Sequence, residues 1–365
     1  MKVLIFGGTG AMGMPLVQML AAQGMEVHVT SRKPRNSTHE NIRYICGNAH
    51  DITFVDSILK NGYDVLIDFM VYQNQEFKAR VHRLLGAVRQ YIFLSSCRVY
   101  AETVTPITED TPRLLDVCKD EEYLKTEEYA LAKAREENIL FASQEKNWTI
   151  VRPSITYNEQ RLQLGCDEIQ NWLYRALKGK PIVFYQCLAD KKTAMTYGGD
   201  VAYAISLLVG NPAALGQAIQ IASPETASWN DILNIYLEVL ESRGIHSHVH
   251  ILKNAETVAD VLGRKWQLKY CRNYNREFDS AKIETICGCK IQYKPIAEGL
   301  QDCLRAFLDS GVMPAAQAHY EAYMDSLTDT RSSLSEFASW KSKAIYCIGR
   351  YTPYFDVVRM LPWRK

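Results

Sequence analysis

The chain has 365 residues, of which 47% are hydrophobic and 23% charged, so it can bury a sizeable core in one large domain or two. Its formal net charge of +1 gives no sign of a nucleic-acid partner or of a strongly acidic substrate. The ten cysteines have no zinc-ligand spacing, and no apolar run reaches the roughly 18 residues of a membrane span. We therefore expect a cytoplasmic protein with free thiols, no bound metal, no signal peptide and no transmembrane segment.

The first predicted element is an apolar strand, "VLIF" at 3–6, which runs directly into the glycine-rich stretch "GGTGAMG". The following "MPLVQMLAAQG" has the spacing of a helix that ends at Gly24, and "EVHVTSR" is typical of a second strand. Glycines let a backbone approach a pyrophosphate, and a helix N-terminus offers amides and a positive dipole end. This strand–turn–helix–strand unit therefore predicts dinucleotide binding.

The end of the second strand bears on the choice between NAD and NADP. An acidic residue there would hold the ribose 2′-hydroxyl of NAD. The chain instead has "TSRKP", with Arg32 and Lys33 and no carboxylate. Because a guanidinium favours a 2′-phosphate, we expect NADP as the cofactor, with NAD as the other option. The alternative is that this stretch is only a solvated loop.

Strands and helices continue to alternate as far as residue 153. The predicted strands lie at 42–48, 63–72, 91–94 and 148–153, and the predicted helices at 52–62, 74–90 and 126–146. This order indicates an α/β fold, a Rossmann-type doubly wound parallel sheet. Ligands of such sheets bind beyond the carboxyl ends of the strands, where Ser95 and Ser96 follow "YIFL".

A tyrosine and a lysine lie four residues apart in "EEYALAKAREE", at Tyr129 and Lys133. The spacing is common by chance, and a second copy occurs at Tyr174 and Lys178. The first copy follows the serine-bearing strand end, whereas no such strand precedes the second. Position therefore favours Tyr129 and Lys133 as an acid–base pair, and the alternative is the solvent face of a charged helix.

Together these features resemble the extended short-chain dehydrogenase/reductase superfamily, in its NAD(P)-dependent epimerase/dehydratase branch. The similarity is carried by "GGTGAMG", "FLSSCRVY", "YALAK", "VRPSITY", "TYGGDVAYAI", "GQAIQIASPETASWNDIL" and "FDSAKIETICG", over about residues 1–310. It implies an NAD(P)-binding Rossmann domain at 1–155 and a smaller substrate-binding domain at 156–325, with segments around 183–205 returning to the sheet. A basic aromatic tail at 326–365 would follow, and we expect a homodimer.

The resemblance also implies roles for single residues. Tyr129 would be the acid–base, Lys133 would favour its ionised form and bind the nicotinamide ribose, and Ser96 would orient the reacting group. The glycines would line the pyrophosphate, and other positions would border the adenine, its ribose and the nicotinamide. The implied cofactor contacts are Gly7, Thr9, Gly10, Met12, Gly13, Arg32, Asn48, Ala49, Phe69, Met70, Ser95, Tyr129, Lys133 and Pro153.

The loop after the serines departs from one pattern of the family. Nucleotide-sugar 4,6-dehydratases carry an acid pair where this chain has Cys97 and Arg98, so dehydration has no evident proton donor. Cys97 is either a cysteine acid of the kind that some epimerases use one place later, or a small residue that fills the strand end, which we favour. Arg98 either meets a substrate phosphate or faces solvent.

Three features of the second half have two interpretations each. The segment after residue 158 contains three cations and an aromatic residue, Arg161, Arg175, Lys180 and Trp172. They either contact the diphosphate and the base of a nucleotide, or they belong to a helix surface and the core. "HSHVH" places His246, His248 and His250 on one face of a strand, as a metal site or, as we favour, a solvent-facing strand. The basic aromatic residues from 341 onward contact a membrane surface or partner, or pack on the chain itself, which we slightly favour.

The sequence thus predicts an NAD(P)-dependent oxidoreductase that acts on a nucleotide-activated sugar, with hydride transfer expected at C4. A 4-ketoreductase and an epimerase both fit this description. The rival from another class is a non-catalytic dinucleotide sensor or an RNA-binding relative of the same fold. The presence of Ser96, Tyr129 and Lys133 argues against the rival, because a sensor needs the glycines but not these three side chains.

Overall fold

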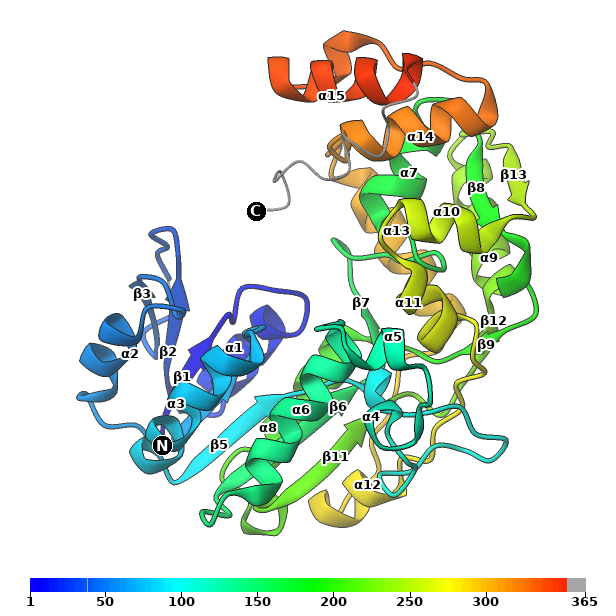
Figure 1. Ribbon diagram of the computed structural model, residues 1–365. Coiled ribbons are helices and arrows are strands. Elements are labelled where there is room, and N and C mark those ends of the chain that lie inside the picture. The colour runs from blue at the N-terminus through cyan, green and yellow to red at the C-terminus, as the bar shows by residue number, and fades with distance from the viewer. Residues whose placement is uncertain (38, 353–365) are drawn as a thin grey trace. The chain divides into compact units, whose positions relative to one another are not determined.

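The computed structural model describes residues 1–37 and 39–352, and the chain forms two compact units (Figure 1). The first unit is assembled from Met1–Asn158, Ala194–Thr226 and Arg276–Ile296. The second consists of Glu159–Thr193, Ala227–Asn275 and the chain from Ala297. The chain therefore passes between the units several times, and each unit is described separately below.

The first unit is built on a seven-stranded sheet with the strand order β11-β6-β5-β4-β1-β2-β3, and all six strand pairs are parallel. This arrangement confirms the predicted doubly wound α/β fold. The carboxyl ends of β1, β4 and β5 are neighbours in this order, which brings the loops after them to one edge. The strands are β1 Lys2–Phe6, β2 Glu26–Ser31, β3 Ile42–Cys46, β4 Val65–Asp68, β5 Gln90–Leu94, β6 Trp148–Pro153 and β11 Gln217–Ile221.

Helices cover both faces of this sheet, as the alternation of buried residues along the strands requires. In β1, Val3 and Ile5 pack on one face with α1 and α8, while Leu4 and Phe6 pack on the other with α2, α3 and α6. Figure 1 shows α3 and α6 against the sheet. The remaining elements of this unit are α1 Gly13–Ala22, α2 Ile52–Leu59, α3 Asn74–Ala87, η1 Cys97–Val99, α4 Leu114–Val117, α5 Glu121–Leu124, α6 Tyr129–Ala142, β7 Ile155–Tyr157, β10 Met195–Tyr197, α8 Gly198–Leu208, η3 Pro212–Ala214 and α12 Ala281–Cys287.

The second unit is mainly helical and contains two small two-stranded sheets, β8 with β13 and β9 with β12. At its centre Trp172 is fully buried and stacks on Tyr236, with ring centroids 4.5 Å apart. Its elements are α7 Ile169–Leu177, β8 Ile182–Tyr185, η2 Gln186–Leu188, β9 Lys192–Thr193, β12 Ala227–Ser228, α9 Trp229–Ser242, β13 Val249–Leu252, α10 Ala255–Val261, α11 Lys265–Gln267, the π-helix η4 Leu268–Arg272, α13 Ile296–Asp309, α14 Ala318–Thr328, η5 Leu334–Glu336 and α15 Trp340–Tyr351.

Most predicted elements are a few residues longer than the observed ones, and two predicted strands differ in a way that matters for the candidate sites. The strand expected at 63–72 ends at Asp68, because the Asp68 carboxylate accepts a hydrogen bond from the Met70 amide (2.9 Å) and turns the chain out of the sheet. The strand expected to carry three histidines begins only at Val249, so His250 alone of the three lies in it. The prediction of one three-histidine strand face is therefore wrong.

Candidate active site

The glycine-rich turn after β1 packs closely against α1, the helix that follows it, and has free space beside one of its glycines. A Cβ on Gly13 would lie only 2.6 Å from the carbonyl carbon of Gly8, so α1 can approach the turn only because Gly13 has no side chain. Gly7 has a φ of +67°, a left-handed conformation that glycine adopts without strain. A Cβ on Gly10, in contrast, would meet nothing within 4 Å.

These observations fit a dinucleotide. Gly10 is exposed and its Cα faces open space, so another molecule's atoms can approach the backbone there. The N-terminal cap of α1 is Met12, which makes no side-chain cap hydrogen bond, and the first turn contains no acidic residue. The positive end of the helix is therefore not neutralised by its own side chains, which suits a phosphate group.

The residues predicted at the adenine end lie on loops after β2 and β3. Arg32 follows directly after β2 and is exposed, so its guanidinium is accessible. Asn48 is also exposed and accepts a hydrogen bond from the His50 amide (3.1 Å). Ala49 is buried, and its carbonyl accepts a hydrogen bond from Arg80 Nη1 (2.7 Å), which fixes this loop to α3.

Lys133 lies beside the chain that leaves β4. Its Nζ donates to the Met70 carbonyl (3.4 Å) and lies 4.5 Å from the centroid of the Phe93 ring on β5. Met70 and Phe69 in turn border the glycine turn, since a Cβ on Gly7 would be 3.4 Å from atoms of both. Four residues predicted separately for cofactor binding are thus contiguous in the structure.

Tyr129 is the first residue of α6, and its position follows from the helix cap. The Glu128 carboxylate accepts from the Ala130 amide (2.8 Å) and forms an ion pair with Arg98, which starts the helix beside η1. The Arg98 guanidinium lies 5.2 Å from the centroid of the partly exposed Tyr129 ring. Arg98 is therefore part of the site's edge rather than a solvent-facing residue, and its charge is shared with Glu128.

Ser96 lies next to Arg98 and caps the short helix η1. Its Oγ accepts a hydrogen bond from the Arg98 amide (3.2 Å), and a hydroxyl that accepts in this way keeps its own proton to donate. Arg98 thus contacts both Ser96 through its backbone and Tyr129 through its guanidinium. The structure therefore brings the strand end that carries the serine to the beginning of the helix that carries the tyrosine.

Ser95 belongs to a buried ionic network that sequence patterns did not reveal. Its hydroxyl donates to Glu137 Oε1 (2.6 Å), and the Arg152 guanidinium holds the same carboxylate through two bonds of 2.7 and 2.8 Å. Arg113 Nη1 adds a fourth donor to it at 3.1 Å. Ser95 thus fixes α6 to the ends of β5 and β6, and its side chain is committed within the protein.

Two more carboxyl groups lie near Lys133, and both are fully buried. Glu136 Oε2 is 3.0 Å from Lys133 Nζ; burial raises the pKa of Glu136 to about 7, against the lowering effect of the Lys133 charge. Burial also raises the pKa of Asp68, although the Met70 amide and the hydroxyls of Tyr72 and Tyr91 donate to it (each 2.9 Å) and lower that pKa in part.

Cys97 is buried in an apolar cluster with Val99 and Tyr100. Its thiol donates to the carbonyl of Arg152 (3.0 Å), which directs it to the neighbouring strand. This geometry supports the interpretation of Cys97 as a small residue that fills the strand end.

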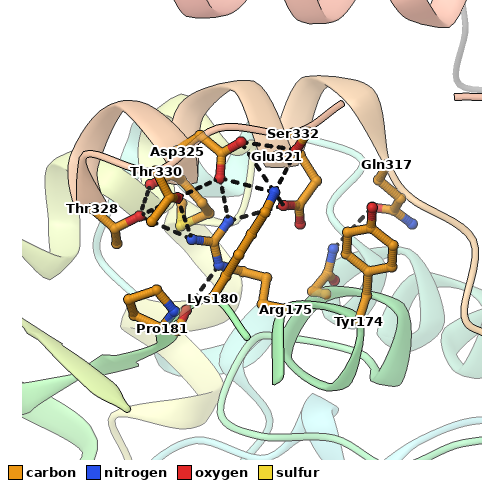
Figure 2. Close-up of polar contacts among 12 residues, drawn as sticks. Tyr174, Arg175, Lys180, Pro181, Gln317, Glu321, Asp325, Thr328, Thr330 and Ser332 are labelled. Atoms are coloured by element: carbon orange, nitrogen blue, oxygen red, sulfur yellow. Dashed lines mark hydrogen bonds and ion pairs between the residues drawn. The ribbon is translucent and has the colours of Figure 1, made fainter. Parts of the chain in front are cut away.

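In the second unit, three of the residues considered for a nucleotide diphosphate are core residues. Trp172 is buried, and Arg175 and Lys180 form a buried ionic cluster with Glu321 and Asp325 of α14 (Figure 2). Arg161 is partly exposed and lies 3.7 Å from Glu168. The Tyr174 hydroxyl donates to Glu336 in the same unit.

The described part of the tail packs on its own unit. Tyr346 of α15 is buried and donates to Asp325 Oδ2 (2.9 Å), and its ring packs on Phe337. The rest of the basic aromatic sequence, from residue 353, lies outside the described residues. Within residues 1–37 and 39–352, no helix is long and apolar enough to cross a membrane, and no three His, Cys, Asp or Glu side chains gather where they could hold a metal ion.

Solved structures with a similar fold include two enzymes named for sugar nucleotides. The UDP-glucuronic acid 4-epimerase of Bacillus cereus, solved with UDP-glucuronic acid and NAD, matches with a TM-score of 0.64 at 16% identity, over 86% of this chain and 100% of that one. The dTDP-glucose 4,6-dehydratase of Bacillus anthracis, solved with NAD, matches with a TM-score of 0.63 at 14% identity, over 85% and 97%. At these identities the likeness concerns the fold.

In sequence, the chain is 27% identical over 197 residues to the chloroplast stem-loop binding protein of 41 kDa b of Arabidopsis thaliana. The match covers 50% of this chain and 48% of that protein, so the chain spans about half the length of the curated relative it matches. Residues 3–222 match the family described as NAD dependent epimerase/dehydratase. This match spans more than half of the chain, including the glycine turn and α6, and the protein therefore belongs to the NAD-dependent epimerase/dehydratase family.

Proposed function

We propose that the protein is an NAD(P)-dependent oxidoreductase of a nucleotide-activated sugar that acts at C4, as a 4-ketoreductase or an epimerase. The observation that carries this proposal is the placement of Tyr129 and Lys133. Tyr129 begins α6 beside Arg98 of the loop that bears Ser96, and Lys133 lies against Phe93 of β5 and contacts the loop that borders the glycine turn. The fold neighbours solved with UDP-sugars and NAD support the same substrate class.

In the proposed reaction, a bound nicotinamide would supply the hydride chemistry at C4, with the hydride given once to the sugar in a reductase or taken and given back in an epimerase. Tyr129 would accept the proton of the sugar hydroxyl when C4 is oxidised and would give a proton to the keto oxygen when C4 is reduced; its side chain is partly exposed. Lys133 supplies a buried positive charge one helical turn away, which favours the negative form of its neighbours and can hold ribose hydroxyls. Ser96 would donate a hydrogen bond to the reacting oxygen and so orient it.

For the cofactor, the exposed Arg32 after β2 and the absence of an acidic residue in "TSRKP" support NADP. The glycine turn would hold the pyrophosphate, with Gly10 as the position of closest approach. Asn48 and Ala49 would border the adenine, and Pro153, at the end of β6, would lie near the nicotinamide. Ser95 supports this region indirectly, because its hydroxyl is bound to Glu137.

The test is incubation of the purified protein with UDP-hexoses and their 4-keto derivatives in the presence of NADP(H) or NAD(H), with product analysis by mass spectrometry and NMR. A reductase consumes NADPH stoichiometrically, whereas an epimerase interconverts two sugars without net change in the cofactor. If no sugar nucleotide is converted and no nicotinamide cofactor binds, the proposal is wrong.

A second candidate function is the binding of structured RNA. It is favoured by one observation, the 27% identity with a protein whose name describes stem-loop binding. Titration of a labelled stem-loop RNA, at several salt concentrations, tests it directly. Tight RNA binding without sugar conversion would favour this candidate over the oxidoreductase.

A further inference from the structure

One side of α6 carries four polar side chains: the partly exposed Tyr129 and the buried Lys133, Glu136 and Glu137. Their spacing of four, three and one residues places them on one side of a helix. Glu137 is fully satisfied by Ser95, Arg113 and Arg152 and has a structural task. Glu136 has no such partners, although its exposed fraction is 0%.

A buried carboxylate without hydrogen-bond donors is costly, so its position requires a reason. Among the described residues no hydrogen bond satisfies either Glu136 oxygen, and its ion partner is the Lys133 ammonium at 3.0 Å. The other charged or titratable groups that act on it are Asp68 at the end of β4, Tyr91 on β5 and Glu127 before α6. None of these is a cation, so the Lys133 charge is what stabilises the ionised form of Glu136 against burial.

The contacts of Lys133 orient its ammonium group. An ammonium has three N–H donors. The ammonium is ion-paired with Glu136 Oε2 at 3.0 Å, one N–H donates to the Met70 carbonyl (3.4 Å), and the face of Phe93 lies 4.5 Å away. The ion pair and this hydrogen bond restrict the orientation of the ammonium, and with it the direction of the donor left for a ligand.

We propose that Glu136 is a positioning residue: its carboxylate holds the Lys133 ammonium so that the remaining donor meets the nicotinamide ribose, and protonation of the carboxylate loosens this hold. The inference rests on the proposed function, in which Lys133 contacts the cofactor. It adds a residue that acts through Lys133 and gives cofactor binding a dependence on pH near neutrality, since burial raises the pKa of Glu136 to about 7.

The first test measures the dissociation constant of NADPH by nicotinamide fluorescence from about pH 6 to about pH 8. Wild type should bind roughly tenfold more weakly at the acid end, the scale seen when a supporting contact of a ligand-binding side chain is lost. Glu136→Gln should bind with the weak affinity at every pH. The matched control is Glu121→Gln, because Glu121 is an exposed carboxylate whose ion partner is Lys125 and which does not act on Glu136, and it should keep the wild-type curve.

The outcomes separate this inference from the proposed function. If wild type binds no nicotinamide cofactor at all, the proposed function is wrong and the inference with it. If wild type binds but its affinity does not change with pH, or if Glu136→Gln keeps the wild-type dependence, only the inference is overturned. Tighter binding at low pH would also overturn it.

A second measurement does not depend on cofactor or on the stability of Glu136→Gln. Infrared difference spectroscopy of the free protein follows the protonated carboxyl band of Glu136, identified by isotope labelling. Because the Lys133 charge lowers the pKa of Glu136 against burial, Lys133→Met should move this titration to higher pH. An unshifted titration would mean that the two groups are not coupled, and would overturn the inference.

Discussion

The buried ionic cluster of the second unit makes a quantitative prediction about stability. Arg175 donates from Nη1 to Glu321 (2.9 Å) and Asp325 (3.0 Å), and from Nε to the Pro181 carbonyl (2.9 Å); its side chain is fully buried. Lys180 contacts the same two carboxylates at 3.2 Å (Figure 2). Two cations therefore balance two buried carboxylates.

Arg175→Met keeps most of the side-chain volume but leaves two carboxylates with one cation. Removal of one partner from a buried ion pair costs about 3–5 kcal/mol, because the remaining charge stays buried without compensation. We expect this loss in the free energy of unfolding of the second unit. The matched control is Arg243→Met: Arg243 pairs with Asp309 at 2.7 Å, but both side chains are largely exposed, so the loss should stay below about 1 kcal/mol.

The assay is urea unfolding, combined with hydrogen exchange of the amides in α7 and α14 to assign the loss to this unit. The double variant Arg175→Met/Glu321→Gln restores the balance between Lys180 and Asp325, so it should be more stable than the sum of the two single changes predicts. A loss from Arg175→Met as small as that from Arg243→Met, or strict additivity in the double variant, would refute the reasoning.

Three further predictions concern the first unit. Arg32→Ala should reduce the preference for NADPH over NADH by roughly 10–100-fold in paired titrations, because a charge-assisted hydrogen bond contributes about 1.5–3 kcal/mol; equal preference in wild type would contradict this. Gly10→Ala should weaken cofactor binding about tenfold or more but leave the unfolding midpoint unchanged, since the added methyl group meets nothing within 4 Å. Gly13→Ala should weaken binding and also destabilise the fold, because its Cβ would lie 2.6 Å from the Gly8 backbone. Burial raises the pKa of Glu136 from 4.5 to about 7, so its contribution to stability is complete below 4.5 and is lost as the pH rises through about 7. Relative to Glu136→Gln, wild type should lose about 3 kcal/mol over this range in urea unfolding, and a constant difference between the two would contradict it.

The doubly wound parallel sheet could be predicted because it depends on local patterns. Apolar runs that alternate with helical spacing specify a parallel sheet, and a parallel sheet places its strand ends at one edge. The same logic distinguished Tyr129 from Tyr174, which lies in the second unit and donates to Glu336. The contacts among Met70, Gly7 and Lys133 became visible only in the structure, because the sequence implied these residues separately.

The partners of buried charges could not be predicted, because they lie far away in the sequence. Arg175 finds Glu321 and Asp325 at separations of 146 and 150 residues, and no local pattern pairs them. Glu136 and Glu137 were missed for another reason: a stretch as charged as "EEYALAKAREE" resembles a solvated helix. Only their helical spacing from Lys133 indicates that they share its buried side of α6.

The central claim, that Tyr129 moves the proton during hydride transfer, is tested most directly by nicotinamide absorbance in a single turnover with a 4-keto-sugar nucleotide. Tyr129→Phe removes one hydroxyl from a partly exposed ring, so it should keep the fold and cofactor binding but slow the absorbance change by about 100-fold or more. Tyr174→Phe, the same change at the second Tyr-x-x-x-Lys copy, should leave the rate nearly unchanged. A wild-type rate in Tyr129→Phe, or a collapse of the rate in Tyr174→Phe instead, would contradict the account.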